Sequence, residues 1–200
     1  MLKRLIFGIA CLLVWTTPAR AAAIIQFEEI GGGVVGTLSG SLDTTGLISA
    51  GNVMTPGGLI AANLAIVGTG DNTNLMAEYK FQLTGPSSFG IGVQTFATSS
   101  VGDQTYLNGH NLAIYLPVTY TSGGALTATI TFDGASFGSL GVNPGDYIYT
   151  LPSGDTYTVS FANANTAVPE PASMTLLGSA LAGLGLARRR KLRLSRTDRT

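Results

Sequence analysis

The sequence predicts an all-β protein: an antiparallel β-sandwich or jelly-roll-like domain of eight or nine strands, with an N-terminal signal helix and a C-terminal transmembrane helix. Apolar and polar residues alternate with period two through much of residues 24–162, which is typical of strands with one buried face. Clusters of Gly, Pro, Asn and Asp interrupt the alternation and indicate turns. No helical period persists for ten residues in this region, so helices are expected only at the two ends.

Residues 1–23 have the three-part layout of a secretory signal peptide: a positive start, an apolar run over residues 5–15, and small residues at the end. A helix over the apolar run would span about 16 Å, too short for a stable transmembrane helix. We expect the Sec translocon to export the chain and signal peptidase to cleave it after Ala23, with cleavage after Ala21 as the alternative.

The only cysteine, Cys11, lies inside this apolar run. A lipid-modified cysteine would stand at the end of such a run, so the pattern does not indicate a lipoprotein. Once residues 1–23 are removed, the protein would have no disulfide, no cysteine-based zinc site and no cysteine nucleophile.

The middle region contains eight predicted strands. In residues 127–132, for example, apolar side chains alternate with threonines; in residues 77–83 we expect Phe81 to face the core and Glu78 to face solvent. The predicted strands are residues 34–42, 63–67, 77–83, 89–95, 112–120, 127–132, 147–151 and 156–161. The last two flank a Pro-Ser-Gly-Asp turn and should pair as a hairpin.

The charges are segregated along the chain. Residues 24–167 contain nine acidic residues and one cation, Lys80, which gives this region a net charge of −8. An acidic domain argues against nucleic acid as a partner, because nucleic-acid binding needs a basic surface. The simpler interpretation of the negative charge is solubility.

No catalytic cluster, metal site or cofactor site is expected in the middle region. The only histidine, His110, lies in a predicted turn, and the acids are scattered, so a pair of glycosidase carboxylates cannot be placed. Residues 71–74 with Glu78 offer oxygen ligands but lack the spacing of a calcium loop, and an Asx turn explains them better. Glycine runs at residues 31–33 and 90–92 do not lie between a strand and a helix, which argues against phosphate binding.

Threonines form two short rows on predicted strands, at residues 127–131 and 156–158. Regular threonine rows on a flat sheet can order water, as some ice-binding surfaces do. Threonine is also a common outward-facing residue of strands, and two short rows do not make a repeated flat array. Ice binding is therefore a lesser alternative.

The C-terminal region divides into a short linker at residues 163–167, an uncharged segment at residues 172–187 and a block of cations. As a helix the uncharged segment would be about 24 Å long, which is short for crossing a membrane. The helix can continue into the cation block, because arginine side chains can reach toward the membrane–water interface. Cationic flanks stay in the cytoplasm, so the β domain is expected on the far side of the membrane.

Residues 168–191 resemble the PEP-CTERM sorting signal in the order of their parts. These parts are a sorting motif of Val168, Pro169, Glu170 and Pro171, the apolar segment, and a stop-transfer block of Arg188, Arg189, Arg190 and Lys191. The basic tail at residues 192–200 is longer than is usual for this family. Similar tails are also described as ice-binding-protein C-terminal segments.

This resemblance implies export across the inner membrane of a Gram-negative bacterium, transient anchoring there, and processing near residues 169–171 by an exosortase-type membrane protease. It also implies a link to exopolysaccharide and biofilm, at the cell surface or in the extracellular matrix. We therefore expect a non-enzymatic surface or matrix protein, with exopolysaccharide as a candidate partner. The alternatives are an exported polysaccharide-acting hydrolase, a protein that keeps its C-terminal anchor, or an ice-binding protein.

Overall fold

The computed structural model describes residues 22–71 and 73–162, and these form two β-sheets. The six-stranded sheet has the order β12 (Gly145–Thr150), β13 (Thr156–Ala162), β1 (Ala22–Ile30), β2 (Gly33–Gly40), β11 (Ala128–Asp133), β8 (Ser99–Gly102). The seven-stranded sheet has the order β3 (Gly51–Met54), β6 (Leu75–Tyr79), β10 (Ala113–Pro117), β9 (Tyr106–Asn108), β5 (Ile66–Gly68), β4 (Leu59–Ala61), β7 (Thr95–Phe96).

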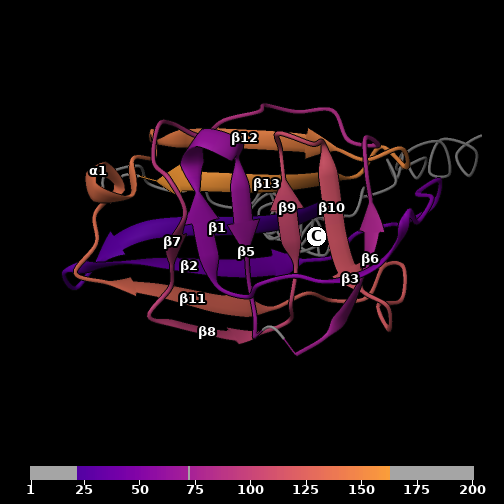
Figure 1. Cartoon of the computed structure of the whole chain (residues 1–200), viewed down its shortest axis with the longest axis horizontal. Helices are drawn as coiled ribbons and strands as arrows, with labels where there is room; N and C mark the ends of the chain where they lie inside the picture. Colours follow the sequence, from indigo (N-terminus) through magenta and orange to yellow (C-terminus); the bar gives the residue numbers. More distant parts are fainter. Residues whose placement is uncertain (1–21, 72, 163–200) are drawn as a thin grey trace, which may run out of the picture. The chain divides into compact units, whose positions relative to one another are not determined.

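The two sheets form two layers whose strands run crosswise to one another (Figure 1). Buried apolar side chains from both layers make one core. Phe27 and Phe161 stack in it with ring centroids 5.0 Å apart, and Phe89 packs edge-on against Phe161. This arrangement corresponds to the orthogonal way of packing two sheets over a shared core. The all-β prediction is confirmed, whereas jelly-roll connectivity stays a prediction.

The number and direction of the strands differ from the prediction. Thirteen strands lie within the described residues, against the eight or nine predicted. One pair is parallel: β1 runs beside β13, with Ile25 opposite Val159, and so the domain is not wholly antiparallel. β1 was not predicted, because its inward alternation covers only Ala23, Ile25 and Phe27 before two glutamates follow.

Several predicted strands were located correctly. Most of the predicted segments 34–42 and 127–132 lies in β2 and β11, and β11 alternates buried and more exposed side chains along its length. β12 and β13 form the predicted hairpin, with Thr150 opposite Thr156. In these strands one face packs on the core and the other faces outward, so the alternation is visible in the sequence.

The predicted strand at residues 77–83 is shifted and ends early. β6 stops at Tyr79, and Phe81 takes a left-handed backbone conformation (φ 56°) with its side chain 75% exposed, so its predicted inward position was wrong. Glu78 was predicted to face solvent but is buried. Both faces of β6 are covered, which removes the alternation on which the prediction relied.

Two weaker strand predictions were largely wrong. Residues 63–67 contain most of a 3₁₀ turn (Ala62–Leu64) and the first part of β5, and of residues 89–95 only Thr95 is in a strand. A short helix, α1 (Phe137–Leu140), is the only α-helix among the described residues; Ser136 caps it by accepting a hydrogen bond from the Ser139 N–H.

The Gly31–Gly32 pair forms the turn between β1 and β2. Both residues have positive φ (63° and 84°), and Ile30 pairs directly with Gly33 across the turn. A two-residue hairpin loop with two positive φ angles matches the twist of the strands and favours glycine. The glycine run therefore has a structural role as a hairpin turn.

Several sequence-based predictions concern residues outside the described part of the chain. These are the signal peptide up to residue 21, the linker from residue 163, the sorting motif, the transmembrane segment, the stop-transfer block and the basic tail. Within residues 22–71 and 73–162, no helix is long and apolar enough to span a membrane. Of the predicted 1–23 signal segment, Ala22 and Ala23 lie in β1.

Candidate binding face of the six-stranded sheet

The outward face of the six-stranded sheet carries polar side chains from all six strands. Residues that pair across neighbouring strands point to the same face, so the ladder registers show which side chains lie side by side. One line of paired residues crosses the whole sheet, and we call it the central row: Asp146, Ser160, Gln26, Thr37, Thr129 and Val101. It presents carboxylate, hydroxyl and amide groups in succession.

Two hydrogen bonds order side chains on this face. Ser160 Oγ donates to Asp146 Oδ1 across the β13–β12 pair at 2.6 Å, and Ser160 is buried. Gln26 Nε2 donates to Glu28 Oε1 at 2.7 Å along β1. Gln26 and Thr37 are paired residues of β1 and β2, so they lie side by side on the sheet.

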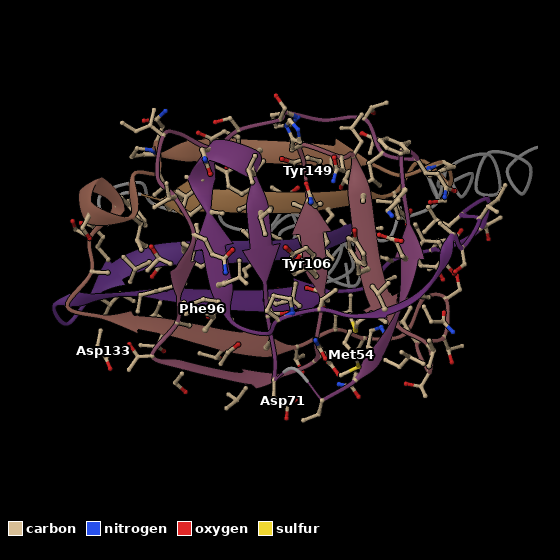
Figure 2. All side chains as sticks on the ribbon, viewed as in Figure 1. Met54, Asp71, Phe96, Tyr106, Asp133 and Tyr149 are labelled. Carbon is tan, nitrogen blue, oxygen red and sulfur yellow. The ribbon has the colours of Figure 1, made fainter. Side chains whose placement is uncertain are left out.

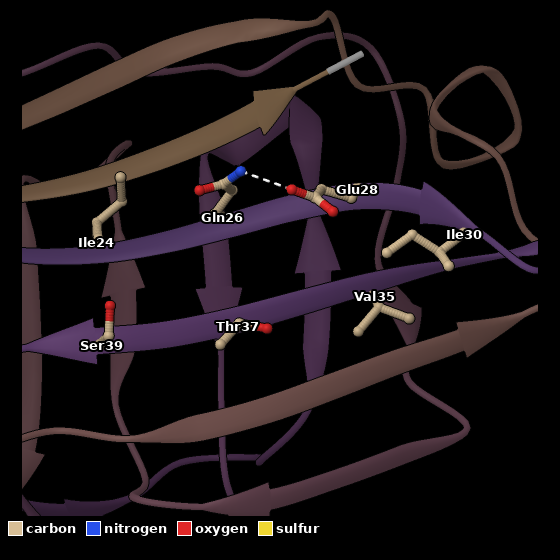
Figure 3. Close-up of a pocket in the computed structure, with 7 residues that line it drawn as sticks. All are labelled: Ile24, Gln26, Glu28, Ile30, Val35, Thr37 and Ser39. Carbon is tan, nitrogen blue, oxygen red and sulfur yellow. Dashed lines mark hydrogen bonds between the residues drawn. The ribbon is translucent and has the colours of Figure 1, made fainter. Parts of the chain in front are cut away.

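An open groove runs along β1 and β2 on this face (Figure 3). Its middle is polar, formed by Gln26, Glu28 and Thr37, and its ends are more apolar. The lining residues are Ile24, Gln26, Glu28, Ile30, Val35, Thr37 and Ser39. Such a surface can donate and accept hydrogen bonds while the isoleucines offer apolar contact.

The predicted threonine rows belong partly to this face. Thr129 is opposite Thr37, and Thr131 is opposite Val35, on the neighbouring strand β2. Thr158 is opposite Ile24 on β1 and opposite Ile148 on β12. The threonines of β11 and β13 are thus separated by β1 and β2, and isoleucine and valine interrupt them, so they do not form one continuous threonine array.

The outward face of the seven-stranded sheet is different in character, because it carries buried apolar clusters. Leu59, Ala61 and Ile66 form one cluster, and Met76 belongs to another with Ala113 and Tyr115. Tyr106 packs against both clusters. Figure 2 shows Tyr106 on this side, with the 63% exposed Phe96 near the edge of the sheet.

A buried charge lies within this second face. Glu78 Oε1 accepts a 2.6 Å hydrogen bond from the Tyr115 hydroxyl, and Glu78 Oε2 is 2.9 Å from Lys80 Nζ. Desolvation raises the pKa of Glu78, but the hydrogen bonds from Tyr115 and Lys80 outweigh it, so the pKa is lower than usual. Desolvation and the neighbouring Glu78 raise the pKa of Tyr115 well above its usual value.

Most carboxylates of the domain accept hydrogen bonds from other groups of the domain. Asp155 Oδ2 accepts the Asp43 N–H at 2.6 Å, and the Asp43 carboxylate accepts from the Thr45 N–H and the Ser122 hydroxyl. Hydrogen bonding from the Thr45 side chain, the Thr45 backbone and the Ser122 side chain lowers the pKa of Asp43. Eight acidic side chains accept such internal hydrogen bonds: Glu28, Glu29, Asp43, Asp71, Glu78, Asp103, Asp146 and Asp155.

The other residues singled out in the sequence have local roles. His110 is exposed in the turn between β9 and β10, where its backbone N–H donates to the Leu64 carbonyl. The Thr73 hydroxyl donates to Asp71 Oδ1 at 2.6 Å within the loop considered for calcium, while Glu78 pairs with Tyr115 and Lys80. The described residues include no group of three or more His, Cys, Asp or Glu arranged to hold a metal.

The sequence predicted some of the outward-facing side chains of this face, but it did not predict that they lie on one sheet with β1 at its centre. The alternation in β11 and β13 placed their threonines outward, but β1 was not predicted, and it contributes Gln26 and Glu28 to the centre of the face. The apolar residues of β1 at alternate positions were a usable signal. The pairing that assembles the central row leaves no local trace in the sequence.

Comparison with known proteins assigns the C-terminal segment. Residues 167–191 match the family described as the PEP-CTERM protein-sorting motif, in agreement with the resemblance found at residues 168–191. No curated protein and no solved structure matches the chain. The motif marks an exported protein that is held transiently at the membrane by its C-terminus and processed by an exosortase-type enzyme.

Proposed function

We propose that this protein is a non-enzymatic component of the cell surface or extracellular matrix of a Gram-negative bacterium, and that its β domain binds exopolysaccharide. The central row carries this proposal: hydroxyl, amide and carboxylate groups from five neighbouring strands lie in one line on an outward face. An extended polymer of sugars offers a matching line of hydroxyl groups.

The chemistry of the face suits weak and repeated contacts. Hydroxyl and amide side chains can exchange hydrogen bonds with sugar hydroxyls, and each such bond contributes about 1 kcal/mol net. Ile24 and Ile30 at the two ends of the groove give apolar contact for the C–H faces of sugar rings. Because the face carries Asp146 and Glu28, a neutral polymer is favoured over an anionic one.

The C-terminal segment would deliver the domain to that location. Pro169 and Pro171 disfavour helix beside the membrane, which keeps the segment around Glu170 extended for a protease. The cation block that begins at Arg188 would stop translocation. Cleavage near residues 169–171 would then release the domain from the inner membrane.

Retention of the exported protein on immobilised polysaccharide tests the binding function. The probes are exopolysaccharide extracted from the producing strain, neutral dextran and anionic alginate. We expect retention on the extracted polymer, and about tenfold weaker retention for the double variant Thr37→Val, Thr129→Val, which keeps β propensity but removes two hydroxyls. Thr121→Val, in an exposed loop, is the matched control. Equal retention of the double variant and this control would contradict binding at the central row.

The mass of the mature protein tests sorting separately. Loss of the residues that follow the processing site near Pro169–Pro171 supports processing, and Glu170→Ala should then accumulate the longer form. A mature protein that retains its chain through Thr200 would contradict processing and would support the permanent anchor instead.

A further inference from the structure

The first two residues of β1 are built into the six-stranded sheet. Ala22 is opposite Thr156, and Ala23 is opposite both Tyr157 on β13 and Gly40 on β2. The Ala22 carbonyl accepts a 3.2 Å hydrogen bond from the Ser41 N–H. The Ala23 side chain is fully buried in the core, where Tyr157 is fully buried as well.

Gly40 shows that the neighbouring strand is shaped around Ala22. Its φ is +111°, a conformation that L side chains rarely adopt, and a Cβ at this position would lie 2.0 Å from the Ala22 carbonyl oxygen. The close approach of the two backbones therefore requires glycine at residue 40. The contact exists only if Ala22 remains part of the folded domain.

The sequence offers two cleavage sites with small residues at the last and third-last positions, as signal peptidase requires. Cleavage after Ala21 places Ala19 and Ala21 at these positions, and cleavage after Ala23 places Ala21 and Ala23 there. Cleavage after Ala22 would put Arg20 at the third-last position and is excluded. The small-residue requirement is therefore met by both the expected site after Ala23 and the alternative site after Ala21.

We propose that signal peptidase cleaves after Ala21 and that the mature protein begins at Ala22. The inference rests on the proposed export. Water hydrolyses the Ala21–Ala22 peptide bond, leaving a carboxylate on Ala21 and an amine on Ala22. The new ammonium group then belongs to an exposed residue at the strand end. Cleavage after Ala23 would instead put the ammonium group on Ile24, which pairs with Thr158 on β13 and with Ser39 on β2. It would also remove Ala23 from the core.

N-terminal sequencing and intact mass of the full chain after export test the proposal. We expect a product that begins Ala22-Ala23-Ile24. A product that begins at Ile24 overturns the inference and leaves export intact. A product that retains Met1 overturns both the cleavage and the export on which it rests.

Two variants sharpen the test. Ala19→Lys places a large cation at the third-last position of the Ala21 site only, so the product that begins at Ala22 should be lost, and Ala19→Ser, which keeps a small residue, should preserve it. Any product of Ala19→Lys that begins at Ile24 should melt about 5–10 °C lower, because it lacks part of β1. An unchanged cleavage site in Ala19→Lys, or an equal Tm for the Ile24 product, would contradict the proposal.

Discussion

The Tyr115 hydroxyl donates a 2.6 Å hydrogen bond to the Glu78 carboxylate directly across the β10–β6 pair. Lys80, the one cation in residues 24–167, binds the other carboxylate oxygen of Glu78 at 2.9 Å and is 42% exposed. The only lysine or arginine of the domain thus balances a buried acid. The outward face of the six-stranded sheet is left without basic side chains.

Removing the Glu78 side chain should destabilise the domain. In Glu78→Ala the buried Tyr115 hydroxyl loses its acceptor and Lys80 loses its partner, so the free energy of unfolding should fall by about 2–3 kcal/mol. Urea denaturation measures this. The exposed Asp133→Asn should change the free energy by about 0.5 kcal/mol or less. Equal effects of the two substitutions would show that the Glu78 contacts contribute little.

The contribution of Glu78 to folding stability should decrease as the pH becomes acidic. Its pKa in the folded protein is below the ordinary value of 4.5, so the folded state binds fewer protons than the unfolded state and stability falls as the pH drops through this range. The stability difference between wild type and Glu78→Gln should be largest at neutral pH and shrink toward about pH 3. A difference that does not change with pH would mean that the charge of Glu78 has no role in stability.

Alkaline pH should destabilise the domain through its buried tyrosines. Burial raises the pKa of Tyr157 to about 12, although its hydrogen bond with Thr105 lowers it slightly. The folded state therefore keeps a proton that the unfolded state releases near the ordinary value of 10, and stability is lost as pH rises above 10. Tyr157→Phe should show a shallower loss of Tm above about pH 10, with Tyr149→Phe for comparison. Identical pH profiles of Tyr157→Phe and wild type would rule out this role for Tyr157.

The Gly40 backbone should tolerate no side chain. In Gly40→Ala the new Cβ meets the Ala22 carbonyl and the backbone is held at φ +111°, so the free energy of unfolding should fall by about 2–3 kcal/mol. Gly31→Asn is the control, because Gly31 has open space around it, φ is +63°, and Asn is accepted in such hairpin turns. Thermal unfolding of the two variants measures the difference. If Gly40→Ala is as stable as Gly31→Asn, the contact between Gly40 and Ala22 is not present in the folded protein.

The parts of the fold that could be predicted share one property: one face is buried and the other is open. β11 and the β12–β13 hairpin show this in their alternation and in the turn between residues 150 and 156. β6 and β10 are covered on both faces, so their alternation is weaker and the position of Glu78 was predicted wrongly. β3, β8 and β9 have only three or four residues each, too few for a clear period.

By itself the sequence determined the all-β class, the strongest outward-facing threonines and the PEP-CTERM motif, because each depends on residues close together in the chain. Only the tertiary structure decided that β1 lies between β13 and β2, that Gln26 stands between Ser160 and Thr37, and that Ala23 belongs to the core. Strand neighbours are chosen by the burial of both sheets against one shared core. That choice depends on all of the strands together, and no local pattern records it.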